Sequence, residues 1–71
     1  MWEPQDDTRE LVLEVMINNP GVRYSIDTMY FKLIYDKNQR NMVDVKWALV
    51  ELHKERLILF DQGRYYVPEH V

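Results

Sequence analysis

The spacing of apolar residues changes once along this chain, from the spacing of helices to that of a β-hairpin. Up to residue 56, apolar side chains recur every three or four residues, as in helices that bury one face. Residues 57–60 are then all apolar, residues 61–64 read Asp-Gln-Gly-Arg, and residues 65–67 read Tyr-Tyr-Val. Two apolar runs around a glycine-containing turn predict paired antiparallel strands. We therefore expect an α+β chain with its helices first and a hairpin last.

The first helix is expected from about Asp7 to Ile17. Asp7 can serve as its N-cap, and the sequence Asn-Asn-Pro-Gly at 18–21 ends it, because the residue before proline avoids the helical region and glycine permits left-handed backbone. Residues 22–24, Val-Arg-Tyr, alternate apolar and polar side chains. This alternation predicts a very short strand between the first two helices.

Two further helices are expected before the hairpin. The second runs from about Ile26 to Tyr35 behind Ser25, a good N-cap, and the wholly polar stretch 36–40 follows it. The third runs from about Met42 to Arg56, with Asn41 as its N-cap. At 100° per residue, four apolar side chains of the third helix share one half of the helical wheel and should face the core: Val45, Ala48, Leu49 and Leu52.

The length of 71 residues without cysteine predicts one domain, residues 1–71, with its core at about 7–67. A chain of this size buries only about 60% of its unfolded surface, so oligomerisation is a common source of added stability. The net charge of −3 argues against general polyanion binding, so any nucleic-acid role must rest on local charge. No apolar run approaches the ~20 residues of a membrane span, and Met1-Trp2-Glu3-Pro4 lacks the features of a signal peptide. We expect a soluble, cytoplasmic protein without membrane contact.

The order helix, short strand, helix, helix and two-stranded hairpin resembles the winged helix-turn-helix superfamily over about residues 7–67. The most specific stretch is Val-Lys-Trp-Ala-Leu-Val-Glu-Leu-His-Lys-Glu-Arg-Leu-Ile at 45–58, which is similar to the third helix and first wing strand of many small prokaryotic and phage regulators. The resemblance implies that the third helix enters the DNA major groove and that the hairpin, or wing, touches the backbone or minor groove. It implies a small transcriptional regulator that binds double-stranded DNA.

Carried over to this chain, the resemblance implies phosphate contacts for Lys37, Arg40 and Arg64. It places three further side chains near base edges: Gln39, Asn41 and Lys46. The stretch 32–46 supports this hypothesis, because its four Lys and Arg outnumber its two Asp and give a local charge of +2. Two simpler readings remain open: a surface loop is polar in any case, and the arginine of the hairpin can simply close a turn. The start of the third helix, Met-Val-Asp at 42–44, also lacks the polar and basic residues that the superfamily often has there.

A second set of apolar residues lies away from the expected core faces. An interface with a second copy of the chain or with another protein would use them, and the first helix would be the seam of a homodimer. The alternative is that the first helix, Trp2 or residues 68–71 cover part of the set. A winged helix that binds protein and not DNA is therefore the second functional hypothesis. The proposed interface residues are Leu13 and Ile17 on the first helix and Val43, Trp47 and Val50 on the third.

The residue types do not predict an enzyme, a metal site or a cofactor. His53 and His70 are far apart in the sequence and have no acidic neighbour at ligand spacing. The single serine, Ser25, already has a capping role, and two isolated glycines cannot build a phosphate-binding loop. We therefore assign no catalytic residue and no metal ligand.

Overall fold

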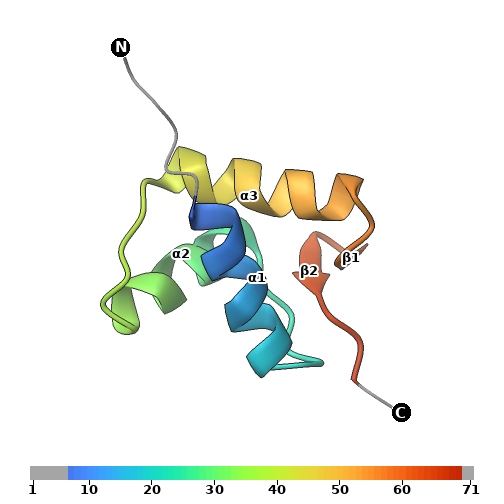
Figure 1. Ribbon diagram of the computed structural model, residues 1–71. Helices are drawn as coiled ribbons and strands as arrows, with labels where there is room; N and C mark the ends of the chain where they lie inside the picture. The colour runs from blue at the N-terminus through green and yellow to red at the C-terminus, as the bar shows by residue number, and fades with distance from the viewer. Residues whose placement is uncertain (1–6, 70–71) are drawn as a thin grey trace.

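The computed structural model describes residues 7–69 (Figure 1). Trp2, His70 and Val71, to which the sequence assigned possible covering or surface roles, lie outside the described residues. Within residues 7–69, three helices precede a two-stranded antiparallel hairpin, so the expected α+β layout of a winged helix is confirmed. The elements are α1 (Thr8–Asn18), α2 (Ile26–Tyr35), α3 (Met42–Lys54), β1 (Leu59–Asp61) and β2 (Arg64–Tyr66).

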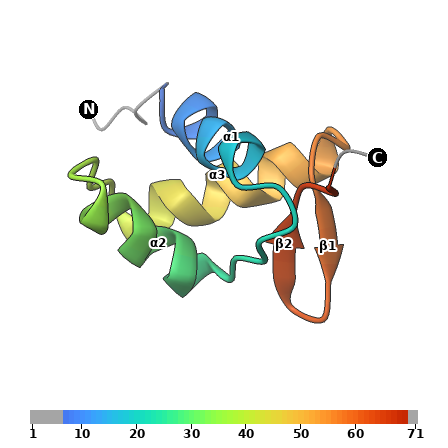
Figure 2. The same cartoon turned by 90° about the horizontal axis from the view of Figure 1, so that it is seen from below.

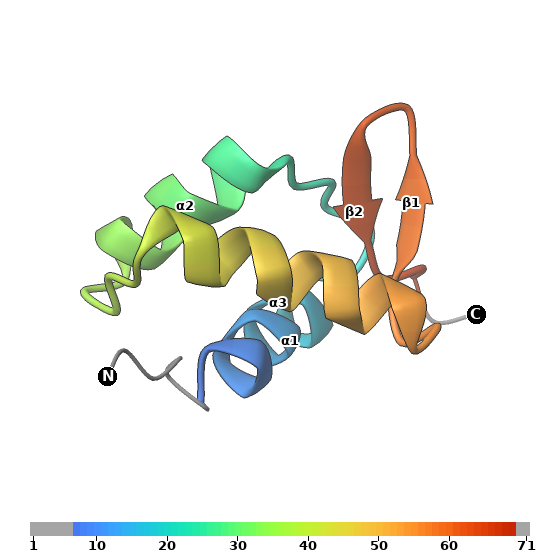
Figure 3. The ribbon, with the colours of Figure 1, turned by 90° about the horizontal axis from the view of Figure 1, so that it is seen from above.

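The longest helix, α3, lies between the other elements. In two opposite views, α1 packs on one side of α3, whereas α2 and the hairpin lie on its other side (Figures 2 and 3). The turn between α2 and α3 is at one end of α3, and the hairpin rises from the other end. None of the helices in residues 7–69 has the length and apolar character needed to cross a bilayer.

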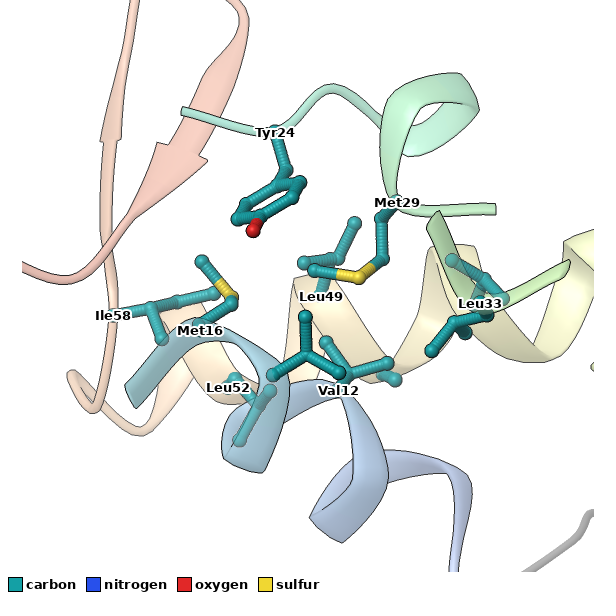
Figure 4. Close-up of a cluster of buried hydrophobic side chains, with 11 residues drawn as sticks. Val12, Met16, Tyr24, Met29, Leu33, Leu49, Leu52 and Ile58 are labelled. Carbon is teal, nitrogen blue, oxygen red and sulfur yellow. The ribbon is translucent and has the colours of Figure 1, made fainter. Parts of the chain in front are cut away.

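The core lies where α1, α2 and the start of the hairpin meet the inner face of α3 (Figure 4). The four residues of α3 expected on the core face are all buried, so that prediction is confirmed. Tyr24 and Ile58 extend the core beyond the helices. The full set of buried hydrophobic residues is Val12, Val15, Met16, Tyr24, Met29, Leu33, Val45, Ala48, Leu49, Leu52 and Ile58.

The starts of the helices follow the sequence with one exception. Ser25 accepts a hydrogen bond from the Thr28 N–H (3.1 Å), and Asn41 accepts one from the Val43 N–H (2.8 Å), as capping residues do. Asp7 occupies the N-cap position of α1 as expected, but its side chain makes no capping hydrogen bond. The cause is its backbone, which is helical (φ −85°, ψ −8°), whereas a capping side chain needs extended backbone.

Both α2 and α3 end in the same motif, with a basic residue where glycine is usual. The Lys37 N–H donates to the Ile34 oxygen and the Asn38 N–H to the Leu33 oxygen, which together form a Schellman motif with Lys37 at φ 61°. The end of α3 repeats this geometry, with Arg56 at φ 63°. The third helix was expected to end at Arg56, but it ends at Lys54. The sequence did not indicate this end, because no glycine occupies the left-handed position.

The hairpin is short and its turn is tight. Gln62 and Gly63 both have positive φ, 51° and 80°, as in the type I′ turn that matches the twist of two strands. The strands are β1 at 59–61 and β2 at 64–66, where 57–60 and 65–67 were expected. Residues 57–58 instead connect α3 to the hairpin, and Ile58 is buried in the core. The expected strand at 22–24 is reduced to one bridge, in which Tyr24 and Tyr65 exchange backbone hydrogen bonds of 2.8 and 2.7 Å.

Candidate nucleic-acid interface

The turn between α2 and α3 presents two of the predicted DNA-contacting residues to solvent. Lys37 and Gln39 are both exposed. The left-handed backbone of Lys37 results from the helix stop described above, so the position of its side chain is set by the end of α2. Within residues 7–69, the Lys37 ammonium group makes no ion pair.

Arg40 has a different environment, because its guanidinium group binds within the chain. One nitrogen, Nη2, lies 2.8 Å from a carboxylate oxygen of Asp7, and Nη1 donates to the backbone oxygens of Asn38 (3.4 Å) and Gln39 (3.2 Å). The side chain is only 17% exposed, and its Nε is buried without a described partner. Arg40 therefore ties the turn to the start of α1, a role that the sequence analysis missed.

Asn41 also has an internal role, because its side-chain oxygen caps α3. The carbonyl group is thus occupied, which leaves the amide nitrogen as the group that can reach outward. Of the four candidates between residues 37 and 41, all but Arg40 are exposed, and Arg40 and Asn41 hold the corner between α2 and α3 in shape.

The outer side of α3 combines one cation with apolar side chains. Lys46 is exposed and makes no ion pair within the described residues, and its Nζ lies 6.0 Å from the centre of the Trp47 ring. Val43 and Trp47 are 50% and 54% exposed, whereas Val50 is half-buried. This side of the helix can therefore offer both a positive group and an apolar surface.

An open groove lies between the start of α2, the first residue of α3 and the hairpin. Its walls carry apolar side chains together with one exposed acid, Asp27. Two of its lining residues, Phe60 and Tyr65, also pack against the His53 ring at centroid distances of 5.7 and 6.0 Å. The lining residues are Ser25, Ile26, Asp27, Met42, Phe60, Gly63 and Tyr65.

The tip of the wing carries the predicted Arg64 and a second arginine that the sequence analysis did not select. Arg64 is exposed and lies opposite Asp61 in the strand register. Asp61 instead pairs with Arg23, from the segment between α1 and α2, at 2.8 Å. The Arg23 guanidinium also stacks over Tyr66, 4.3 Å from the ring centre. Contacts between residues distant in sequence, including the bridge at Tyr24, bring this arginine to the hairpin, so no local sequence signal could have found it.

The outer side of α1 is less apolar than expected. Leu13 is half-buried and packs against the core, so it does not point away from the core as the helical wheel suggested. Ile17 is exposed as expected, but Glu10 and Glu14 are its exposed neighbours. A seam through α1 would therefore bring acidic groups of two copies together.

Four of the basic side chains in the described residues are paired with acids, and the unpaired ones include three predicted contacts. Arg9 pairs with Glu55 and Lys32 with Asp36, in addition to the pairs of Arg23 and Arg40 described above. In the part of the chain that the structure describes, five Lys and Arg side chains make no ion pair: Lys37, Lys46, Lys54, Arg56 and Arg64.

The described residues do not bring together three or more histidine or carboxylate side chains that could hold a metal ion. Comparison of the chain with protein-family models, with curated proteins and with solved structures gives no match.

Proposed function

We propose that this chain binds double-stranded DNA as a small winged-helix transcriptional regulator of prokaryotic or phage type, acting in the cytoplasm. The observation that carries the proposal is that three basic side chains are exposed and lack an ion pair among the described residues. Lys37 in the turn, Lys46 on α3 and Arg64 on the wing are exposed and make no ion pair among residues 7–69. In a winged helix these are the three places that approach DNA.

The roles of the candidates differ. Lys37 and Arg64 neutralise phosphates, which positions the protein without reading sequence. Lys46 and Gln39 approach base edges, where an ammonium group meets the guanine acceptors and an amide pairs with adenine. Arg40 binds Asp7 and Asn41 caps α3, and both contacts fix the corner between α2 and α3. We therefore assign these two residues a structural role in shaping the interface.

Salt dependence gives the direct test of this proposal. Two phosphate-neutralising cations, Lys37 and Arg64, predict that log affinity for a duplex falls with log salt at a slope of about −1.8, since each phosphate contributes about −0.9. Fluorescence anisotropy with a labelled duplex between ~50 and ~200 mM salt measures it. The Arg64→Ala variant should reduce the magnitude of the slope by about 0.9, whereas Lys46→Ala should weaken binding with little change in slope. Undetectable binding at ~50 mM salt would contradict the proposal.

Lys37→Gly and Arg56→Gly form a matched pair for the same measurement. Each removes one positive charge and places glycine at a left-handed residue that ends a helix. We expect Lys37→Gly to weaken duplex binding and reduce the slope, and Arg56→Gly at the far end of α3 to leave both nearly unchanged. An equal effect of the two variants would mean that binding responds only to net charge.

The second candidate function is protein binding through the outer side of α3, with a second copy as the simplest partner. It is favoured by the exposure of Val43 and Trp47, which is unusual for a helix that reads DNA. Trp47→Ala should then cost about 2 kcal/mol or more of partner affinity, as a buried aromatic anchor does. Sedimentation should show a species near twice 8.7 kDa that this variant loses. A monomer at high concentration that binds duplex DNA would exclude the homodimer reading.

A further inference from the structure

Two arginines and one carboxylate from separate parts of the chain line a polar hollow at the tip of the wing. Arg23 reaches it from the segment between α1 and α2, and Asp61, Gln62 and Arg64 come from the hairpin. We propose that this hollow is a phosphodiester-binding subsite made by Arg23 and Arg64, and that the Asp61 carboxylate occupies it in the free protein. The inference rests on the proposed DNA binding. It adds that the Asp61 carboxylate competes with a DNA phosphate for the hollow.

The backbone and a ring hold Arg23 in place for this role. The next residue, Tyr24, is fixed to β2 by two backbone hydrogen bonds, and the guanidinium carbon lies over the Tyr66 ring, 4.3 Å from its centre. An arginine stacked in this way keeps its planar set of donors oriented. Its contact with Asp61 uses only Nη1, and no other hydrogen bond of the group to a described residue is present. The remaining donors can bind a second oxygen of a tetrahedral anion.

The Asp61 carboxylate can compete with a phosphate for Arg23 without preventing the phosphate from binding. The Arg23–Asp61 pair is about half exposed on both sides, and pairs of this kind are weak. Arg64 is the strand partner of Asp61, so the same carboxylate also lowers the positive potential around Arg64. A phosphate that enters the hollow is opposed by the Asp61 carboxylate, which holds Nη1 of Arg23 and repels the anion, and this lowers the affinity of the wing for DNA.

The test is the Asp61→Asn variant, measured by duplex binding as a function of salt. Asparagine can still accept a hydrogen bond from Arg23, so the hairpin keeps its contact, but the competing charge is gone. We expect binding to tighten roughly three- to tenfold and the salt slope to steepen by about 0.9, the value for one added phosphate. Both changes should vanish when Arg23→Gln is combined with Asp61→Asn.

Asp27→Asn is the matched control, because it removes an exposed acid beside the neighbouring groove without touching an arginine. It reports the general effect of one less negative charge. If Asp61→Asn tightens binding no more than Asp27→Asn, or does so equally without Arg23, the subsite is excluded while DNA binding stands.

A second measurement works without DNA and keeps the two proposals distinguishable. Inorganic phosphate, compared with chloride at equal ionic strength, should shift the NMR signals of the Arg23 and Arg64 side chains in Asp61→Asn, and less in the parent. If no variant binds a duplex but phosphate gives these shifts, the proposed function fails and the anion site remains. If phosphate shifts neither side chain in Asp61→Asn, the subsite is excluded.

Discussion

The two sides of α3 differ in how much they contribute to the hydrophobic core. The inner side carries Leu49 and Leu52, which are fully buried against the other elements. The outer side carries Lys46 and Trp47, which are exposed and lie outside the core cluster of the described residues. One helix therefore supplies much of the core on one side and presents a surface that the fold does not require on the other. Substitutions on the two sides should separate stability from binding.

The largest effect is expected on the inner side. Leu49→Ala should lower the free energy of unfolding by about 2–5 kcal/mol, because a fully buried leucine leaves a cavity, and this is a large part of the stability of so small a domain. Urea unfolding followed by circular dichroism measures it. Lys46→Ala on the outer side is the control and should stay within about 0.5 kcal/mol of the parent. Equal stabilities of Leu49→Ala and Lys46→Ala would show that the two sides of α3 contribute equally to the stability of the fold.

The inner side was predictable from sequence because burial repeats with the period of the helix. Val45 and Leu49 follow from spacing alone, and so do the caps at Ser25 and Asn41, whose hydrogen bonds are local. The early end of α3 was not predictable, because a basic residue takes the left-handed position that glycine normally marks.

The candidate interface was only partly predictable, because its pairings are not local in sequence. Arg40 meets Asp7 across 33 positions and Arg23 meets Asp61 across 38. These contacts form only after α1 and the hairpin have packed on α3, so composition could place the cations but could not show which ones are paired. Periodicity likewise placed Leu13 outside the core, although its long side chain reaches back to it.

The next effect distinguishes two arginines that the sequence treated alike. Arg40→Ala should destabilise the fold by about 1 kcal/mol, because it removes an ion pair with Asp7 and two backbone hydrogen bonds that hold the turn. Arg64→Ala should leave thermal stability nearly unchanged and weaken duplex binding. Thermal unfolding of both variants measures the difference. A melting temperature that falls only in Arg64→Ala would reverse the assignment.

A smaller effect in the opposite direction is expected at the helix ends. Lys37→Gly and Arg56→Gly should each raise the free energy of unfolding, by up to about 1 kcal/mol, because glycine adopts positive φ without the steric cost that a Cβ brings. Chemical unfolding of the single and double variants measures this gain. Destabilisation of both variants would show that the side chains contribute contacts that outweigh the relief of strain.

The smallest effect concerns Tyr24, where the core meets the hairpin. Burial raises the pKa of its phenol above the ordinary value near 10; Lys32 opposes the rise and Asp36 adds to it. Below pH 10 the phenol is protonated in both the folded and the unfolded chain, so it adds nothing to the pH dependence of stability. Above pH 10 the unfolded chain loses this proton first, and the free energy of unfolding falls as the pH rises toward the folded-state pKa.

Tyr24→Phe removes this contribution and leaves the ring in the core. The stability difference between the parent and Tyr24→Phe should be constant below about pH 9 and should shift in favour of the variant above pH 10. Tyr35→Phe is the matched control, because Tyr35 is 83% exposed and should leave the alkaline decline of the parent in place. Urea unfolding at a series of pH values from 7 upward measures both differences. A parallel decline of the parent and Tyr24→Phe would show that the phenol titrates alike in the folded and unfolded chain, and that the junction between core and hairpin is open to water.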